Sequence, residues 1–230
     1  MKDAGLAGGA ARTALAALVE SALAAVRAGL AVAYPTETLY GLGADAASER
    51  AIGRLLAWKG REASQPLTIL VEKAAALEGL GIALPAAGQA LIDAFWPGPL
   101  TLVLPARRRF APGVGRADGA VGVRCSSHPL AAALAARLAN EGLTITSTSL
   151  NRTGGVPART RAEARAVCGE GEGAMLLLDD AGPPEPSGVA STVLDLTASS
   201  PRLLRAGAVS REALERVVGR LQATGPEIAA

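Results

Sequence analysis

The sequence is poor in the residues on which many enzyme classes depend. Its 230 residues include one histidine, two cysteines and only 3% aromatic residues. The single histidine, His128, is the one candidate base for a Ser-His-Asp triad, and no GxSxG motif accompanies it. No His, Cys or Asp residues have zinc-site spacing. Cys125 and Cys168 are too few for a disulfide scaffold, so we expect free thiols and no metal site.

Signals for membranes, secretion and common nucleotide folds are absent as well. No apolar run approaches the ~18 uncharged residues of a spanning helix. Residues 1–9 carry Lys2 beside Asp3 and no hydrophobic region of a signal peptide. We therefore expect a cytoplasmic protein with no membrane partner. Neither a GxxxxGK[ST] phosphate loop nor a GxGxxG fingerprint occurs, which argues against those two nucleotide-binding folds.

The sequence is rich in apolar residues and nearly balanced in charge. Half of the chain is hydrophobic and 19% is charged, enough for a substantial core. The net charge is +2, and the only dense basic cluster is Arg107-Arg108-Arg109, so direct binding of nucleic acid is expected to be weak or absent. Only three of the 23 basic residues are lysine, which draws attention to Lys59.

Hydrophobic periodicity predicts alternating helices and strands. Helices are expected over residues 13–28, 49–59, 85–95, 128–140, 160–168 and 211–221. Strands are expected over residues 30–34, 67–71, 100–104, 120–124, 143–148, 175–178, 191–196 and 202–205. Ser48, Ser127 and Ser210 stand where N-caps are expected, and Gly60 where a helix ends. The pattern predicts one α/β domain with a mixed sheet over residues 13–221, between flexible tails at 1–12 and 222–230.

Two polar stretches follow apolar strand-like runs, at residues 34–43 and 147–154, and Lys59-Gly60-Arg61 follows a helix. Cations in the last turn of a helix interact favourably with its dipole, and alternating Ser and Asn residues suit an edge strand and an Asx turn. The alternative is a small-molecule site in which Lys and Arg bind a polyphosphate. Both interpretations remain open on these features alone.

The sequence predicts different roles for Arg124 and His128. Arg124 ends an apolar strand, and a buried charge without a partner costs several kcal/mol. It therefore needs an anion, either a carboxylate of the protein or one of a substrate. His128 precedes a helix and is expected to open it rather than to act in chemistry.

Taken together, the motifs resemble the YrdC family of threonylcarbamoyl-AMP synthases. They occur in family order over about residues 15 to 217, and the KxR and SxN pair is the most specific. The matching stretches are Tyr34 to Gly43, Lys59-Gly60-Arg61, Pro66-Leu67, Phe95 to Thr101, Val123-Arg124, His128-Pro129, Ser147 to Asn151, Ser191 to Asp195, and Leu204 to Ala208.

This resemblance implies a twisted α/β sheet around a deep, positively lined cavity, in a short-form member. It implies synthesis of L-threonylcarbamoyladenylate from L-threonine, bicarbonate and ATP, with release of pyrophosphate. Mg²⁺ would arrive with the ATP. The product would pass to a tRNA threonylcarbamoyl transferase complex, for modification of adenosine 37. The implied nucleotide-binding residues are Lys59, Arg61, Ser149, Asn151, Ser191 and Arg205, with Lys59 and Arg61 catalytic. The implied threonine-side residues are Thr36, Tyr40, Arg124 and Ser147.

The sequence departs from the family pattern at several positions. Leu70 replaces a frequent histidine, Leu150 replaces the alanine of Ser-Ala-Asn, and Ser126-Ser127 replaces Pro-Asp. Arg152 follows the SxN motif, where it could narrow the pocket or add a phosphate contact. Leu70 and Leu150 motivate an alternative function, a paralogue that forms or binds a related carbamoyl-adenylate. A second alternative is an RNA-binding module, which the scarcity of aromatic residues disfavours.

Overall fold

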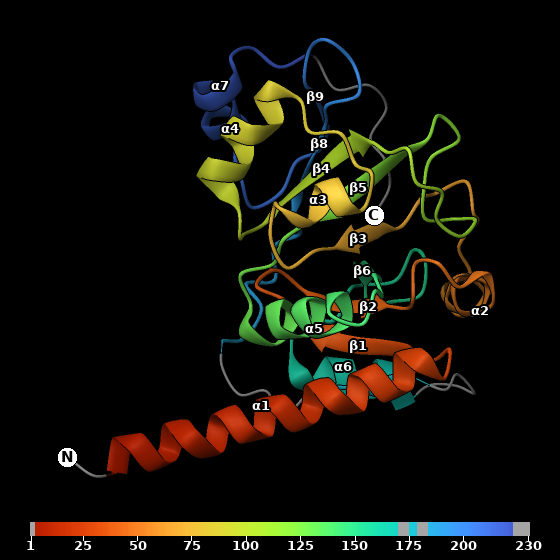
Figure 1. The fold of residues 1–230 in the computed structure, drawn as a ribbon, viewed down its shortest axis with the longest axis vertical. Coiled ribbons are helices and arrows are strands. Elements are labelled where there is room, and N and C mark those ends of the chain that lie inside the picture. The colour runs from red at the N-terminus through yellow and green to blue at the C-terminus, as the bar shows by residue number, and fades with distance from the viewer. Residues whose placement is uncertain (1–2, 170–174, 179–183, 223–230) are drawn as a thin grey trace.

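A computed structural model describes residues 3–169, 175–178 and 184–222, and in these ranges the strands join into one mixed sheet (Figure 1). The strand order is β7-β1-β2-β6-β3-β5-β4-β8-β9. Neighbours pair in parallel at β1–β7, β3–β5 and β4–β8, and antiparallel elsewhere. The strands are β1 (Ala31–Pro35), β2 (Tyr40–Gly43), β3 (Thr68–Leu70), β4 (Leu100–Pro105), β5 (Ala120–Arg124), β6 (Ile145–Ser149), β7 (Met175–Leu177), β8 (Thr192–Asp195) and β9 (Arg202–Arg205). The predicted α/β class and mixed sheet are confirmed.

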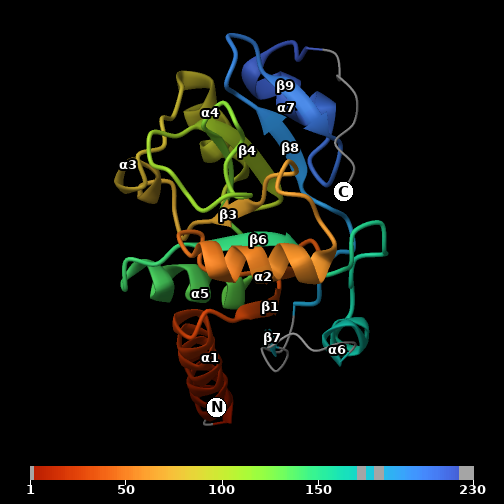
Figure 2. The ribbon, with the colours of Figure 1, turned by 90° about the vertical axis from the view of Figure 1, so that its right-hand side faces the viewer.

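Helices flank the sheet near both of its ends and beside its middle strands (Figures 1 and 2). The helices are α1 (Asp3–Arg27), α2 (Glu49–Lys59), α3 (Ala76–Gly79), α4 (Ala86–Phe95), α5 (Pro129–Ala139), α6 (Arg161–Gly169) and α7 (Arg211–Val218). α1 and α5 pack against each other and against β1, while α4 and α7 pack together near β8 and β9. Among the described residues, no helix has the length and apolar character needed to cross a bilayer.

In the described part of the chain, two large hydrophobic cores and a small third cluster of Val103, Ala120 and Leu204 support the sheet. The smaller core joins α1 and α5 to β1, through side chains such as Leu23, Leu130 and Leu134. The larger core contains residues from α2, α4 and α7 together with Leu102 and Val123 of the central strands. Because side chains alternate along a strand, Leu102 and Val123 turn one face of β4 and β5 to this core and leave the other face for different contacts.

Most helix boundaries follow local capping chemistry. The Ser48 and Ser210 hydroxyls accept from the backbone N–H groups of Ala51 and Ala213, as predicted, and Gly60 ends α2 at a left-handed φ of 64°. The predicted Ser127 cap is wrong. The cap of α5 is His128, whose Nδ1 accepts from the backbone N–H of Leu130, because the helix begins only at Pro129.

Other sequence-based boundaries also differ from the structure. α1 begins at Asp3 rather than at residue 13. β2 lies within the polar stretch 34–43, where no strand was predicted, because it pairs with distant β6. The short helix α3 was not predicted either. Apart from Gln222, the proposed C-terminal tail lies outside the described residues, and the division into a domain and tails stays a prediction.

Gly43 allows β2 to approach β6 closely, and this generates a stability prediction. A Cβ at Gly43 would stand 2.0 Å from the backbone oxygen of Thr146. We expect Gly43→Ala to lower the free energy of unfolding by ~1–3 kcal/mol, the usual cost of overpacking. The control is Gly53→Ala on α2, where a Cβ meets nothing within 4 Å, and a gain of ~0.5–1 kcal/mol is expected. Urea denaturation measures both changes, and equal stabilities of the two variants would contradict the prediction.

Candidate functional site

A pocket lies on the face of the central strands that is turned away from the larger core. Along β6, Ser147 and Ser149 are two residues apart and both line the pocket, as do Thr101 and Val103 on β4. This spacing follows from the alternation of side chains along a strand. The other lining residues come from β2, β3, β5, β8, β9 and nearby loops, and include Thr36, Thr38, Tyr40, Arg61, Thr68, Arg116, Arg124, Ser191 and Arg205.

Two of the four arginines that line the pocket have no carboxylate partner in the described part of the chain. Arg61 donates to the carbonyl oxygens of Gln65 and Pro66 and to the Thr148 hydroxyl. Arg205 donates from Nε and Nη2 to the Ser191 carbonyl oxygen, at 3.1 and 2.9 Å, and from Nη2 to the Ser191 hydroxyl. Burial lowers the pKa of both groups, and Arg124 and Arg61 lower that of Arg205 further. The positive charges of Arg61 and Arg205 are therefore not offset by a carboxylate among the described residues.

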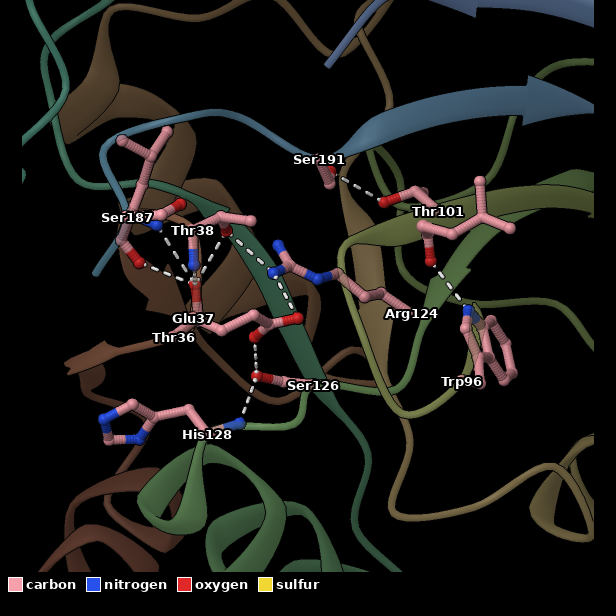
Figure 3. A network of polar contacts seen from close by, with 12 residues as sticks. Thr36, Glu37, Thr38, Trp96, Thr101, Arg124, Ser126, His128, Ser187 and Ser191 are labelled. Atoms are coloured by element: carbon pink, nitrogen blue, oxygen red, sulfur yellow. Dashed lines mark hydrogen bonds and ion pairs between the residues drawn. The ribbon is translucent and has the colours of Figure 1, made fainter. Parts of the chain in front are cut away.

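The other two arginines are neutralised by the protein. Arg124 is buried and lies 2.9 Å from a carboxylate oxygen of Glu37 (Figure 3). Arg116 pairs with Asp195 at 2.8 Å and also with Asp118. The expected anionic partner of Arg124 is thus, at least in part, a protein carboxylate.

Lys59 lies behind the pocket wall rather than in its lining. Its side chain is buried, and Nζ donates to the carbonyl oxygens of Ser149 (2.6 Å) and Asn151 (2.9 Å) and to Asn151 Oδ1 (3.3 Å). Burial, followed by the charge of Arg61, lowers the Lys59 pKa from 10.5 to about 7. Lys59 thus joins the end of α2 to the turn after β6, with its amino group directly behind Ser149.

The side chain of Asn151 also forms hydrogen bonds within the turn after β6. Its Nδ2 donates to the carbonyl oxygens of Arg152 and Gly155, and its Oδ1 accepts from the Ser149 hydroxyl at 2.6 Å. Of the KxR and SxN residues, Arg61 and Ser149 therefore line the pocket, whereas Lys59 and Asn151 shape its wall. The nucleotide-binding roles of all four stay predictions.

A chain of hydroxyl groups continues from Arg124 into the turn before β2. Arg124 Nη2 donates to Thr38 Oγ1 at 2.7 Å, and Thr38 and Thr36 share a hydrogen bond of 2.9 Å. The Thr36 hydroxyl donates to the carbonyl oxygen of Leu39, so its one proton is used there and Thr38 is the donor to Thr36. Thr36 thus builds the turn that places Thr38, and both line the pocket.

The remaining predicted residues lie around the same pocket. Ser147 and Tyr40 line it from β6 and β2, and Tyr40 is buried. Ser191 connects two elements, since its hydroxyl accepts from Arg205 and shares a 3.0 Å hydrogen bond with Thr101. The structure therefore brings Thr36, Tyr40, Arg61, Arg124, Ser147, Ser149, Ser191 and Arg205 to one pocket.

Sequence reasoning missed four functional candidates: Glu37, Thr38, Thr101 and Arg116. Glu37 and Thr38 stand inside the motif Tyr34 to Gly43, and Thr101 ends the motif Phe95 to Thr101, so motif membership was the available signal. Arg116 lies in a loop outside every motif. Its pocket position depends on Asp195, which is distant in sequence.

The unusual positions lie away from the pocket lining. Leu70 is buried in the smaller core and Leu150 in the larger one. The Arg152 guanidinium carbon lies 4.5 Å from the centre of the Trp58 ring, a cation–π contact, so the expected narrowing of the pocket or phosphate contact is not seen. The Ser126 hydroxyl donates to Glu37 and supports the partner of Arg124 instead.

The donor set of the pocket suits anions rather than metals. Among the described residues, those that line the pocket include four arginines and no Asp or Glu. Groups of three or more His, Cys, Asp or Glu residues that could hold a metal are likewise not found in the described ranges. Mg²⁺ prefers carboxylate and phosphate oxygens, so these residues do not fit a protein-held Mg²⁺ site.

Comparisons with solved structures agree with this fold. A structure of Pyrococcus abyssi Sua5 complexed with L-threonine has a TM-score of 0.78 at 34% identity, over 89% of this chain and 58% of that one. Escherichia coli YciO shares the fold with a TM-score of 0.69 at 22% identity, over 86% of this chain and 92% of that one.

Sequence comparisons identify the family. A Mycobacterium tuberculosis (strain H37Rv) relative is 38% identical over 87% of this chain and 89% of its own length. The threonylcarbamoyl-AMP synthase of Bacillus subtilis is 37% identical over 87% of this chain and 56% of its own. The family model Sua5_yciO_yrdC, described as "Telomere recombination", matches residues 24–207. The chain therefore belongs to the Sua5/YciO/YrdC family.

Proposed function

We propose that this protein is an adenylate-forming enzyme that makes L-threonylcarbamoyladenylate from L-threonine, bicarbonate and ATP and releases pyrophosphate. Its class would be that of a nucleotidyltransferase. The observation that carries the proposal is the pair Arg61 and Arg205, which line one pocket and lack carboxylate partners in the described part of the chain. Two partly buried cations that donate only to neutral oxygens favour the binding of an anion, and a triphosphate meets this need.

At the nucleotide end, Arg61, which follows α2, and Arg205, the last residue of β9, would both contact the phosphates. The hydroxyl groups of Ser149 and Ser191 would add hydrogen bonds. Lys59 lies behind Ser149, so its charge adds to the attraction without being in the pocket lining. Asn151 would hold the Ser149 hydroxyl in place. Lys59 and Arg61 are the groups proposed to stabilise charge that develops on the phosphates during transfer.

At the amino-acid end, Arg124 would receive the carboxylate of L-threonine. Its Nη2 is engaged by Thr38 and Glu37, while its buried Nε has no hydrogen-bond partner in the structure. Tyr40, Ser147 and the turn formed by Thr36 line the adjoining wall. The threonine complex of the P. abyssi relative supports an amino-acid site in this fold.

The chemistry requires positioning and charge stabilisation more than a nucleophile. The threonine amine and bicarbonate give a carbamate with loss of water. A carbamate oxygen then bonds to the α-phosphorus of ATP as the bond to the pyrophosphate oxygen breaks. Fixed cations and hydroxyls stabilise such a transfer without a covalent enzyme intermediate. A pocket of arginines, serines and threonines is adequate for this work.

The source of Mg²⁺, the acceptor of the product and the amine specificity are also part of the proposal. Since the described lining residues offer no carboxylate, Mg²⁺ would enter bound to the phosphates of ATP. The adenylate would pass to a tRNA threonylcarbamoyl transferase complex in the cytoplasm. Leu70 and Leu150 lie in the cores, so the residues that motivated a paralogue of different amine specificity do not contact the pocket.

Pyrophosphate release tests the function. Release is expected to need both L-threonine and bicarbonate. Arg61→Gln and Arg205→Gln should each raise the KM for ATP ~10–100-fold, since a charged hydrogen bond contributes ~1.5–3 kcal/mol. Arg54→Gln, at an exposed position of α2, is the matched control and should leave KM unchanged. Release that proceeds equally without threonine would refute the proposed reaction.

Proton uptake tests the position of the triphosphate near Lys59. With a pKa of about 7, Lys59 is largely neutral in the free protein at pH 8, and a bound triphosphate would raise that pKa. ATP binding should therefore take up ~0.5–0.9 proton at pH 8, and ATP affinity should fall as pH rises above 7.

Calorimetry in two buffers of different ionisation enthalpy measures this uptake. Lys59→Arg, which stays charged, should take up essentially none at pH 8. Equal uptake by the wild type and by a folded Lys59→Arg variant would place the triphosphate away from Lys59.

A further inference from the structure

The arginines that line the pocket differ in how their charges are compensated. Arg61 and Arg205 donate only to neutral oxygens, whereas Arg124 is ion-paired with Glu37 within the same lining. A triphosphate carries several negative charges and would be attracted by every unneutralised arginine it could reach. Something must therefore keep phosphate away from the arginine at the amino-acid end.

Glu37 lies outside the pocket lining, where its carboxylate can reduce the attraction of Arg124 for phosphate. Its side chain is 16% exposed. One carboxylate oxygen lies 2.9 Å from Arg124 Nη2, and the other accepts from the Ser126 hydroxyl (Figure 3). The Ser187 backbone N–H donates to the Glu37 carbonyl oxygen, which fixes the main chain as well. Glu37 can thus cancel the charge of Arg124 without occupying ligand space.

The ionised state of Glu37 has support from its contacts. The charge of Arg124 and the hydrogen bond from Ser126 lower the Glu37 pKa, against the opposing effect of burial, which is the largest single contribution. A carboxylate with a lowered pKa remains charged at neutral pH. At neutral pH, Glu37 therefore offers Arg124 a charged partner.

The geometry of Arg124 also limits what it can bind. Nη2 already donates a hydrogen bond to Thr38 and forms an ion pair with Glu37. Nε is buried and has no hydrogen-bond partner in the structure. This leaves Nη1 as the guanidinium nitrogen without such a constraint, so Arg124 offers an incoming anion fewer N–H groups than a free guanidinium does.

We propose that Glu37 is a positioning residue that sets the charge selectivity of the pocket: by neutralising Arg124, it makes the amino-acid end accept a carboxylate and reject phosphate. This inference rests on the proposed function, because it takes Arg124 as the carboxylate site. It predicts that the charge of Glu37, more than its shape, separates the two substrates within one pocket.

The test compares pyrophosphate binding to the wild type and to Glu37→Gln, which keeps the side-chain volume and removes the charge. Calorimetry with inorganic pyrophosphate should show at least tenfold tighter binding by Glu37→Gln. In the same variant, pyrophosphate should compete with L-threonine, whereas in the wild type it should compete with ATP alone. Unchanged pyrophosphate affinity in folded Glu37→Gln would overturn the proposal.

Two controls separate charge from structure. Glu37→Asp keeps the charge, and Ser126→Ala removes the hydrogen bond to Glu37 but keeps both charges, so both should bind pyrophosphate within threefold of the wild type. A purely structural role would instead make Glu37→Asp and Ser126→Ala behave like Glu37→Gln, which would overturn the proposal.

A second variant covers the case in which Glu37→Gln does not fold. The double variant Glu37→Gln/Arg124→Gln removes both charges together, and its pyrophosphate affinity should stay within threefold of the wild type. A tenfold loss would mean that Arg124 is itself a phosphate ligand, contrary to the proposal. These binding measurements do not require turnover, so a lack of threonine-dependent pyrophosphate release would count against the proposed function alone.

Discussion

The partial or complete burial of positive charge in and behind the pocket is the constraint on which the rest of the structure depends. A buried cation needs an anion or several well-placed acceptors, and the chain meets this need differently at each position. Arg124 and Arg116 have carboxylates, Lys59 has three oxygens of the turn after β6, and Arg61 and Arg205 have neutral oxygens. This unequal compensation is the basis of the proposal that one pocket has two ends with different ligand preferences.

The fold places these charges by pairing strands that are far apart in sequence. β6 lies between β2 and β3, so its serines face the same pocket as Tyr40 and Thr68. Close backbone contacts hold this arrangement: at Gly207, an added Cβ would lie 2.4 Å from the Ala190 carbonyl oxygen, beside the segment that carries Ser191. Packing of glycine against backbone thus sets the position of a polar group in the pocket.

Much of this could be predicted from the sequence, because the signals are local. Apolar runs located most strands, and serine caps located two helix starts. The edge strand considered for the alternating serines is wrong, because β6 lies between β2 and β3. The anionic partner of Arg124 was predicted as a need, although its identity was not. The prediction of an N-cap at Ser127 was wrong, because α5 begins at Pro129 and His128 therefore occupies the N-cap position.

The features that could not be predicted from the sequence depend on contacts between residues far apart in the chain. The position of Lys59 behind the wall follows from its bonds to Ser149 and Asn151, about ninety residues away. β2 exists because β1 and β6 pair with it, not because its residues form a strong strand pattern. The choice of Glu37 as the partner of Arg124 likewise requires the turn at residues 36–39 to fold against β5.

The most direct test of the two-ended pocket is whether both substrates bind at once. L-threonine affinity can be measured by calorimetry with and without a saturating, non-hydrolysable ATP analogue. If the phosphates occupy the Arg61 and Arg205 end and the carboxylate occupies Arg124, threonine affinity should be equal or tighter with the analogue present. Mutually exclusive binding would mean that both ligands use the same cations, and it would contradict the division of the pocket by charge.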